Sequence, residues 1–220
     1  MRESRRRPPA LLVPADGWGR PRFPTKGDGL GDGPASESSI PAPVLGTLFL
    51  IAGDVMLFAG LLFVFWVLRL AAPVWPPPLQ PRLPVALTAV NTLVLLASSG
   101  AVVAALRARR RRDQAGLRRG LALGALLGGL FLAIQGYEWV RLIGFGLTAN
   151  SGIYGAIFYV LIGTHAVHVL AALAWLAATV GRGRGAGLGP DAAARLEACA
   201  LYWYFVVALW PVLYVSVYLL

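Results

Sequence analysis

The fold of this chain is decided by residues 131–175, FLAIQGYEWVRLIGFGLTANSGIYGAIFYVLIGTHAVHVLAALAW. This stretch holds two apolar runs, each long enough to cross a bilayer, joined by a short loop. Four polar or ionisable residues lie inside the runs: Gln135, Glu138, His165 and His168. An ionisable side chain in hydrocarbon costs roughly 2.5 to 3.5 kcal/mol, so it normally faces a bundle interior and has a partner. We therefore expect these side chains to point inward.

The composition of the whole chain is that of a membrane protein. Of its 220 residues, 57% are hydrophobic and 14% are charged, which is too apolar to cover a soluble globule with polar surface. The net charge of +10 would otherwise suggest nucleic acid, but the basic residues lie between apolar runs, so we expect no nucleic-acid partner. The single cysteine, Cys199, lies in an Ala-rich apolar run and is expected to be a packed hydrophobe.

Hydropathy predicts an all-α polytopic membrane protein, a bundle of five transmembrane helices. Each apolar segment is close to the ~20 residues that a spanning helix needs. Pro211 lies inside the last segment and is expected to kink it. Residues 1–42, rich in Pro and Gly with 7 basic and 5 acidic residues, are expected to form a disordered basic cytoplasmic tail, either solvated or touching anionic lipid. The membrane domain then covers residues 43–220, with helices at about 43–69, 83–106, 119–143, 152–180 and 196–219.

Basic residues predict the orientation of the bundle. The tail, the loop after the second segment and the loop before the fifth together carry 17 of the 20 basic residues. The other side has only Arg69, Arg82 and Arg141. Because the arginine-rich side faces the cytoplasm, we expect a bacterial-type inner membrane protein with its N-terminus cytoplasmic and its C-terminus outside.

The polar residues at membrane depth suggest helix contacts. Asp54 lies about eleven residues into the first helix, near mid-bilayer, where we expect it to be hydrogen-bonded and protonated, or paired. Asn91 and its polar neighbours on the second helix are able to hydrogen-bond to adjacent helices. Small residues repeat every fourth position on the third helix and allow close helix contact: Gly120, Gly124 and Gly128.

Glu138 follows Gln135 by three residues, and His168 follows His165 by three, so each pair shares one helix face. A histidine pair on one face is able to hold one side of a metal, but it cannot supply both axial ligands of a haem, and no Cys-x-x-Cys-His motif is present. The main interpretation is a buried hydrogen-bonded cluster with Glu138 or Asp54, and metal ligation is the lesser alternative.

Six blocks of this sequence, in order, resemble cytochrome c oxidase subunit III. They span essentially all of residues 44–220 and are specific as a set. The blocks are GDVMLFAGLLFVFW (53–66), WPPP (75–78), NTLVLLASSG (91–100), QGYEW (135–139), GIYGAIFYVLIGTHAVHV (152–169) and YWYFVVALW (202–210).

The resemblance implies an all-helical, noncatalytic subunit of a haem-copper oxidase that supports the stability and proton uptake of its partner. No haem or copper is expected in this chain, since the family leaves these to the catalytic subunits; phospholipid is often bound. The implied partners are oxidase subunit I, as the main contact, subunit II and membrane lipid. The family's polar positions correspond to Asn91, Glu138, Tyr154, His165 and His168, and Trp203 falls in the Tyr-Trp block.

The chain also departs from the family pattern. Asp54 stands where the family usually has Glu, one methylene longer. Tyr204 and Val207 stand where the family usually has His and Asp, so the resemblance does not imply a polar link through the fifth helix. Five helices replace the seven of the longer form, and the missing pair is either supplied by another subunit or absent. The resemblance therefore does not imply the lipid-filled cleft that the longer form makes with its first two helices.

Two other functions remain open from the sequence. The nearer is an accessory membrane subunit of nitric oxide reductase, whose family resembles subunit III closely. The more distant is a small transporter or intramembrane enzyme working through Asp54, Glu138 and the histidines. Against it, the sequence has no second half with a matching interrupted helix and no nucleophile and base set.

Overall fold

The computed structural model describes residues 40–78, 83–182 and 190–220, and in these ranges all regular structure is helical. Five helices are long and apolar enough to cross a membrane. This confirms the predicted all-α bundle of five membrane helices. Most of the predicted tail, residues 1–39, lies outside the described residues. The helices are α1 (Ala42–Ala71), α2 (Val85–Arg110), α3 (Gln114–Gly144), α4 (Ile153–Arg182) and α5 (Pro190–Tyr214), followed by the π-helical turn η1 (Val215–Leu219).

Three helix ends extend by four residues or more beyond the segments predicted from hydropathy. Helix α2 continues to Arg110 rather than 106, α3 begins at Gln114 rather than 119, and α5 begins at Pro190 rather than 196. The added residues are mainly arginine and alanine, which favour helix although arginine is not apolar. The Asp113 side chain also caps α3 by accepting a hydrogen bond from the Gly116 N–H at 2.9 Å. Hydropathy therefore located the membrane spans but underestimated the lengths of these three helices.

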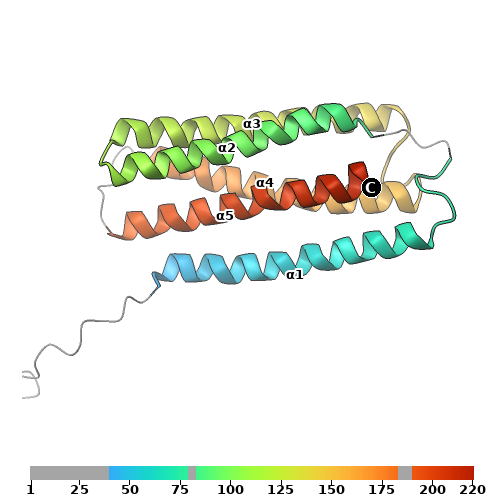
Figure 1. The fold of residues 1–220 in the computed structure, drawn as a ribbon, viewed down its shortest axis with the longest axis horizontal. Helices are drawn as coiled ribbons and strands as arrows, with labels where there is room; N and C mark the ends of the chain where they lie inside the picture. The colour runs from blue at the N-terminus through green and yellow to red at the C-terminus, as the bar shows by residue number, and fades with distance from the viewer. Residues whose placement is uncertain (1–39, 79–82, 183–189) are drawn as a thin grey trace, which may run out of the picture. The chain divides into compact units, whose positions relative to one another are not determined.

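Helix α5 lies at the centre of the bundle in contact with α1, α2 and α4 (Figure 1). Helices α2 and α3 form a closely packed antiparallel pair, and α3 also contacts α4. Pro211 lies within α5, which continues to Tyr214 before it changes to η1. This arrangement lets polar side chains of α5 reach residues on three other helices.

Glycines on α3 allow the close packing predicted from their spacing. A Cβ atom on Gly120 would lie 2.8 Å from the Ala105 Cβ, and one on Gly124 would lie 2.8 Å from a methyl group of Val102, both on α2. Contacts this short do not occur between real Cβ atoms and their neighbours, so a larger residue would push α2 and α3 apart. The small residues thus set the separation of the pair.

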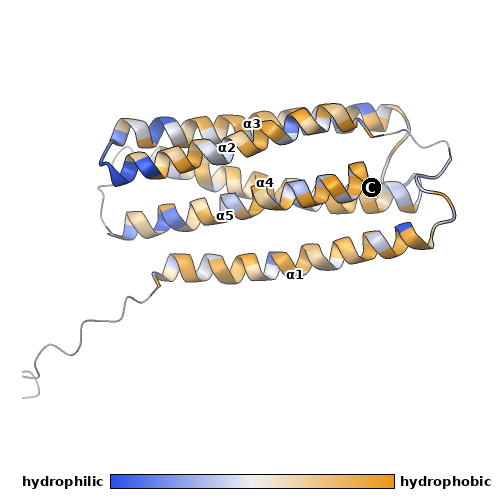
Figure 2. Ribbon diagram, in the orientation of Figure 1, coloured by the Kyte–Doolittle hydropathy of each residue, from blue (hydrophilic) through white to orange (hydrophobic). Residues whose placement is uncertain are grey.

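The helices are apolar along most of their length (Figure 2), and many of their large apolar side chains are exposed. On α1, Phe49, Met56 and Phe63 are 72%, 76% and 70% exposed. A soluble monomer rarely exposes a contiguous apolar surface of this extent, whereas hydrocarbon tails cover it without cost. Together with the five spans, this surface marks a multi-pass membrane protein.

Candidate functional site

Asp54 lies on α1 in a buried contact with α4 and α5. Its Oδ2 accepts a hydrogen bond from the Tyr202 hydroxyl at 3.0 Å. Its Oδ1 lies 3.4 Å from Nε2 of His168. Asp54 and His168 therefore join the first and fourth helices near mid-bilayer, and Tyr202 adds the fifth. We call these three residues the aspartate cluster.

The hydrogen bonds of His168 restrict where protons lie in the aspartate cluster. Nδ1 of His168 lies 2.7 Å from the carbonyl oxygen of Thr164, and a carbonyl only accepts, so Nδ1 carries a hydrogen. A neutral imidazole then presents the lone pair of Nε2 to Asp54. A single proton, either on the carboxyl group or on Nε2, suits this 3.4 Å contact. In both forms the pair carries no net charge, as its depth in the membrane favours.

Glu138 lies in a separate cluster between α2, α3 and the end of the chain. Its carboxyl oxygens are both 3.1 Å from the Thr88 hydroxyl, and Oε2 accepts from the Gln135 amide at 3.2 Å. The same amide nitrogen lies 3.3 Å from the Tyr218 hydroxyl oxygen. We call Thr88, Gln135, Glu138 and Tyr218 the glutamate cluster; all four residues are buried.

The Thr88 hydroxyl has one hydrogen for three nearby acceptors. It lies 2.9 Å from the carbonyl oxygen of Pro84, one turn earlier, as well as beside both Glu138 oxygens. The Pro84 carbonyl also accepts from the Thr88 backbone N–H at 3.1 Å, so it does not depend on the hydroxyl hydrogen. The Thr88 hydroxyl is therefore able to donate to Glu138, and the Gln135 amide supplies a second donor to the same carboxyl group.

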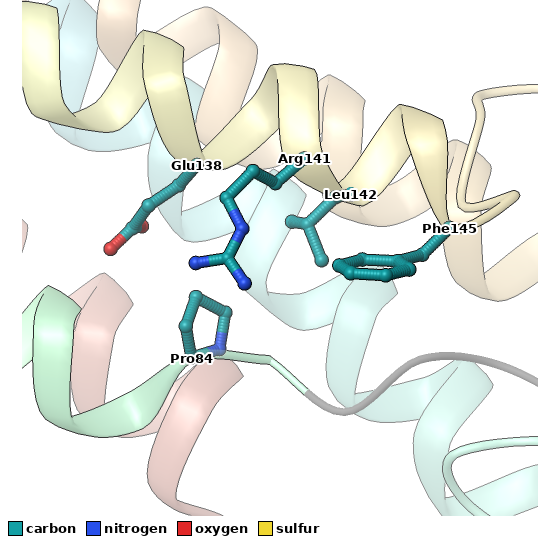
Figure 3. Close-up of a pocket in the computed structure, with 5 residues that line it drawn as sticks. All are labelled: Pro84, Glu138, Arg141, Leu142 and Phe145. Carbon is teal, nitrogen blue, oxygen red and sulfur yellow. The ribbon is translucent and has the colours of Figure 1, made fainter.

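A shallow pocket approaches Glu138 from the end of α3 (Figure 3). Glu138 and Arg141 both extend toward Pro84 there, and Leu142 and Phe145 complete the wall. The Arg141 guanidinium lies over the Phe145 ring, 5.9 Å from its centre. The pocket therefore lies beside the glutamate cluster at one end of the bundle. Both a carboxyl group, from Glu138, and a cation, from Arg141, line it.

His165 is hydrogen-bonded to neither cluster. It is 1% exposed, stacks on Trp210 with 5.1 Å between ring centres, and its ring nitrogens have no hydrogen-bond partner among the described residues. Trp210 in turn donates to the Thr92 hydroxyl at 2.8 Å. His165 therefore acts here as a packed aromatic ring.

The remaining predicted residues make packing contacts or single bonds. Asn91 donates its amide to the Phe131 carbonyl at 3.1 Å and so links α2 to α3. Tyr154 packs edge-on against Trp75, 5.0 Å between ring centres. Trp203 is fully buried, and its ring fills the space where a Gly128 side chain would be.

The structure thus divides the predicted polar residues between two clusters. His168 pairs with Asp54, whereas Glu138 pairs with Gln135 of its own helix and with Thr88. Sequence reasoning missed Thr88, Tyr202 and Tyr218, although Thr88 lies one turn before Asn91 and a buried tyrosine hydroxyl generally needs a partner. Polar links are present at this end of the chain despite the changes at Tyr204 and Val207, because Tyr202 and Trp210 of α5 and Tyr218 of η1 supply them.

Metal ligation finds no support in these contacts. Both ring nitrogens of His168 are engaged, by Thr164 and Asp54. Within the described ranges no three His, Cys, Asp or Glu residues gather as a metal-binding group. Cys199 is buried and unpaired there.

Comparison with known proteins identifies the family. Residues 41–220 match the family "Cytochrome c oxidase subunit III". The chain is 37% identical over 174 residues to "Cytochrome c oxidase subunit 3" of Synechocystis sp., covering 79% of this chain and 73% of the relative. It is 32% identical over 177 residues to the protein of the same name from Bacillus subtilis, covering 80% and 85%. The match takes in both clusters and all five helices, and this chain belongs to the cytochrome c oxidase subunit III family.

Proposed function

We propose that this chain is the noncatalytic subunit III of a haem-copper terminal oxidase in aerobic respiration. The observation that carries the proposal is the family match across the whole membrane domain. Relatives from Synechocystis sp. and Bacillus subtilis bear the oxidase name. These names favour an oxidase over the nitric oxide reductase alternative, and no contact in the described residues favours a transporter. Haem and copper then belong to the partner catalytic subunits.

The proposed role is to stabilise the catalytic subunit and to support its proton uptake. The two polar clusters support this role because their members bond to neighbouring helices inside the bundle rather than to an open reaction site. The exposed apolar faces, such as that of α1, offer a low-dielectric flank for oxidase subunit I, for subunit II or for lipid. Bound phospholipid fits the same surface.

Removal of this chain from the native complex tests the proposed role. Complex purified from cells with and without the chain should show the same haem spectrum and nearly the same initial rate of oxygen consumption. The complex without it should lose activity faster over repeated turnover or on standing in detergent. Loss of the first turnovers in a fully assembled complex would instead place this chain in the chemistry, and the noncatalytic assignment would have to be withdrawn.

The absence of a cofactor from this chain has its own test. Purified alone in detergent, the chain should show no Soret absorption and no stoichiometric copper or iron. A bound metal that is lost on His165→Ala or His168→Ala substitution would overturn this part of the proposal.

We also propose that the N-terminus is cytoplasmic and the C-terminus periplasmic, in a bacterial inner membrane. The distribution of the basic residues supports this orientation. Ala115 and Ala149 are exposed at opposite ends of the bundle, and the one native cysteine is buried, so it gives little background. In intact cells a thiol reagent that does not cross membranes should label Ala149→Cys and should label Ala115→Cys only after the membrane is opened. The reverse pattern would refute the orientation.

A further inference from the structure

One end of the bundle carries a dense group of arginines that no part of the proposed oxidase role uses. Figure 2 shows this end as the most hydrophilic part of α2 and α3. Only three acidic residues of the described chain lie there, Asp113, Asp191 and Glu197, and Glu197 pairs with Arg109 at 3.3 Å. The exposed basic residues, which we call the arginine surface, are Arg107, Arg110, Arg111, Arg112, Arg118, Arg119 and Arg195.

The turn between α2 and α3 holds this surface in a compact form. The Asp113 N–H donates to the Ala108 carbonyl at 2.9 Å, and the Asp113 side chain caps α3. Arg112 takes a positive φ of 60°, which allows the chain to reverse within three residues. Because the turn is short and the helices are close at Gly120, arginines from both helices meet in one small area.

The arginine surface is distinguished by its side-chain type as well as by its positive charge. Every basic residue on it is arginine, and the only lysine of the chain is Lys26. The planar guanidinium group donates two parallel hydrogen bonds to a phosphate, whereas an ammonium group acts as a point charge. The surface also lies where two membrane spans end, at the level of lipid headgroups.

We propose that the arginine surface binds anionic phospholipids of the surrounding membrane, with guanidinium groups holding the headgroup phosphates in bidentate contacts. Charge complementarity favours this occupant, because the surface is cationic and at headgroup depth. An acidic face of a neighbouring protein is the competing occupant. The proposal rests on the membrane location of the chain and does not depend on its supporting role in an oxidase.

The test compares lipid selection by the full chain and by two variants in nanodiscs. The discs contain phosphatidylglycerol and phosphatidylcholine, and spin-labelled or mass-resolved lipid reports which headgroup is enriched beside the protein. One variant replaces Arg110, Arg111, Arg112 and Arg119 by Gln, and the other replaces the same four by Lys. Nanodiscs expose both faces equally, so a variant with altered insertion in cells is still measured correctly.

The unmodified chain should enrich phosphatidylglycerol, and salt should weaken the enrichment. One basic residue near an anionic surface contributes a factor of about five in binding, so the Gln variant should lose enrichment by about tenfold or more. The Lys variant keeps the positive charge and the preference of this end for the cytoplasmic side, but it loses the paired hydrogen bonds of the guanidinium group. Its enrichment of phosphatidylglycerol should therefore fall about threefold. Arg141→Gln, at the opposite end, is the control for the loss of one basic residue outside the arginine surface and should change enrichment by no more than about fivefold.

Three results would overturn the proposal. Unchanged enrichment in the Gln variant would show that the surface does not select anionic lipid. Equal enrichment by the Lys variant and the unmodified chain would refute bidentate recognition. Enrichment that stays intact while the Gln variant fails to co-purify with other subunits of its complex would assign the surface to an acidic protein partner. Thermal unfolding of each variant checks that its fold is retained.

Discussion

The proton accounting at Asp54 predicts which substitution the aspartate cluster tolerates. An asparagine at this position is able to accept from the Tyr202 hydroxyl with its carbonyl oxygen and to donate from its amide to the Nε2 lone pair of His168. Asp54→Asn therefore replaces both contacts, which are 3.0 and 3.4 Å long, without a charge. We expect it to change the free energy of unfolding by less than about 0.6 kcal/mol, the average for one hydrogen bond between membrane helices.

Asp54→Leu keeps the branched shape of the side chain but leaves the Tyr202 hydroxyl and Nε2 of His168 without their partner. Uncompensated burial of polar groups costs on the order of 1 to 3 kcal/mol, so this variant should be clearly less stable than Asp54→Asn. Tyr202→Phe, which removes one hydroxyl, is the intermediate control at about 0.6 kcal/mol.

The assay is reversible unfolding in mixed micelles of increasing dodecyl sulfate content, followed by helical circular dichroism and by fluorescence of the seven tryptophans. A difference of 1 kcal/mol changes the folded-to-unfolded ratio about fivefold, which such a titration resolves. If Asp54→Asn proved as costly as Asp54→Leu, the cluster would require the charged carboxylate, and the proton of the pair would then lie on Nε2 of His168.

Three further expectations concern the rest of the bundle. In the same titration, Glu138→Ala should destabilise the chain by about 1 to 3 kcal/mol and Asn91→Ala by about 0.6 kcal/mol. The reason is that Glu138 has partners on two helices, whereas Asn91 makes one bond. The opposite ranking would contradict the hydrogen-bond assignment. Gly124→Leu should cost roughly 1 to 3 kcal/mol by separating α2 from α3, and Gly53→Leu, with no atom within 4 Å of its added Cβ, should cost little. His165→Phe should shift stability by less than about 1 kcal/mol, since it keeps the stack on Trp210 and removes two unbonded nitrogens; a larger loss would reveal a polar partner of His165.

Prediction and structure differ most at the helix ends and in the polar contacts of α5. Hydropathy placed the five spans, yet it stopped α2 at 106 and began α3 at 119, because it scores arginine as an interruption. A helix tolerates arginine well, and its ends here are decided by local capping at Asp113 and by the proline at position 190. The polar links of α5 could not be read from the two changed family positions, because other residues of the helix, Tyr202 and Trp210, make the bonds.

The sequence by itself determined that this chain crosses a membrane five times as helices, and that its few ionisable residues at depth face inward. The physical reason is that hydrocarbon leaves backbone groups no partner outside a helix and makes an exposed charge costly. Only the tertiary structure decided the partners. Asp54 and Tyr202 are 148 positions apart, and Glu138 and Thr88 are 50 apart. The helical period tells which residues share a face of one helix. The residues that oppose this face depend on how each helix is rotated and on how closely its neighbours pack. Small residues such as Gly120 and Gly124 set that closeness through contacts with another helix, which no single segment contains.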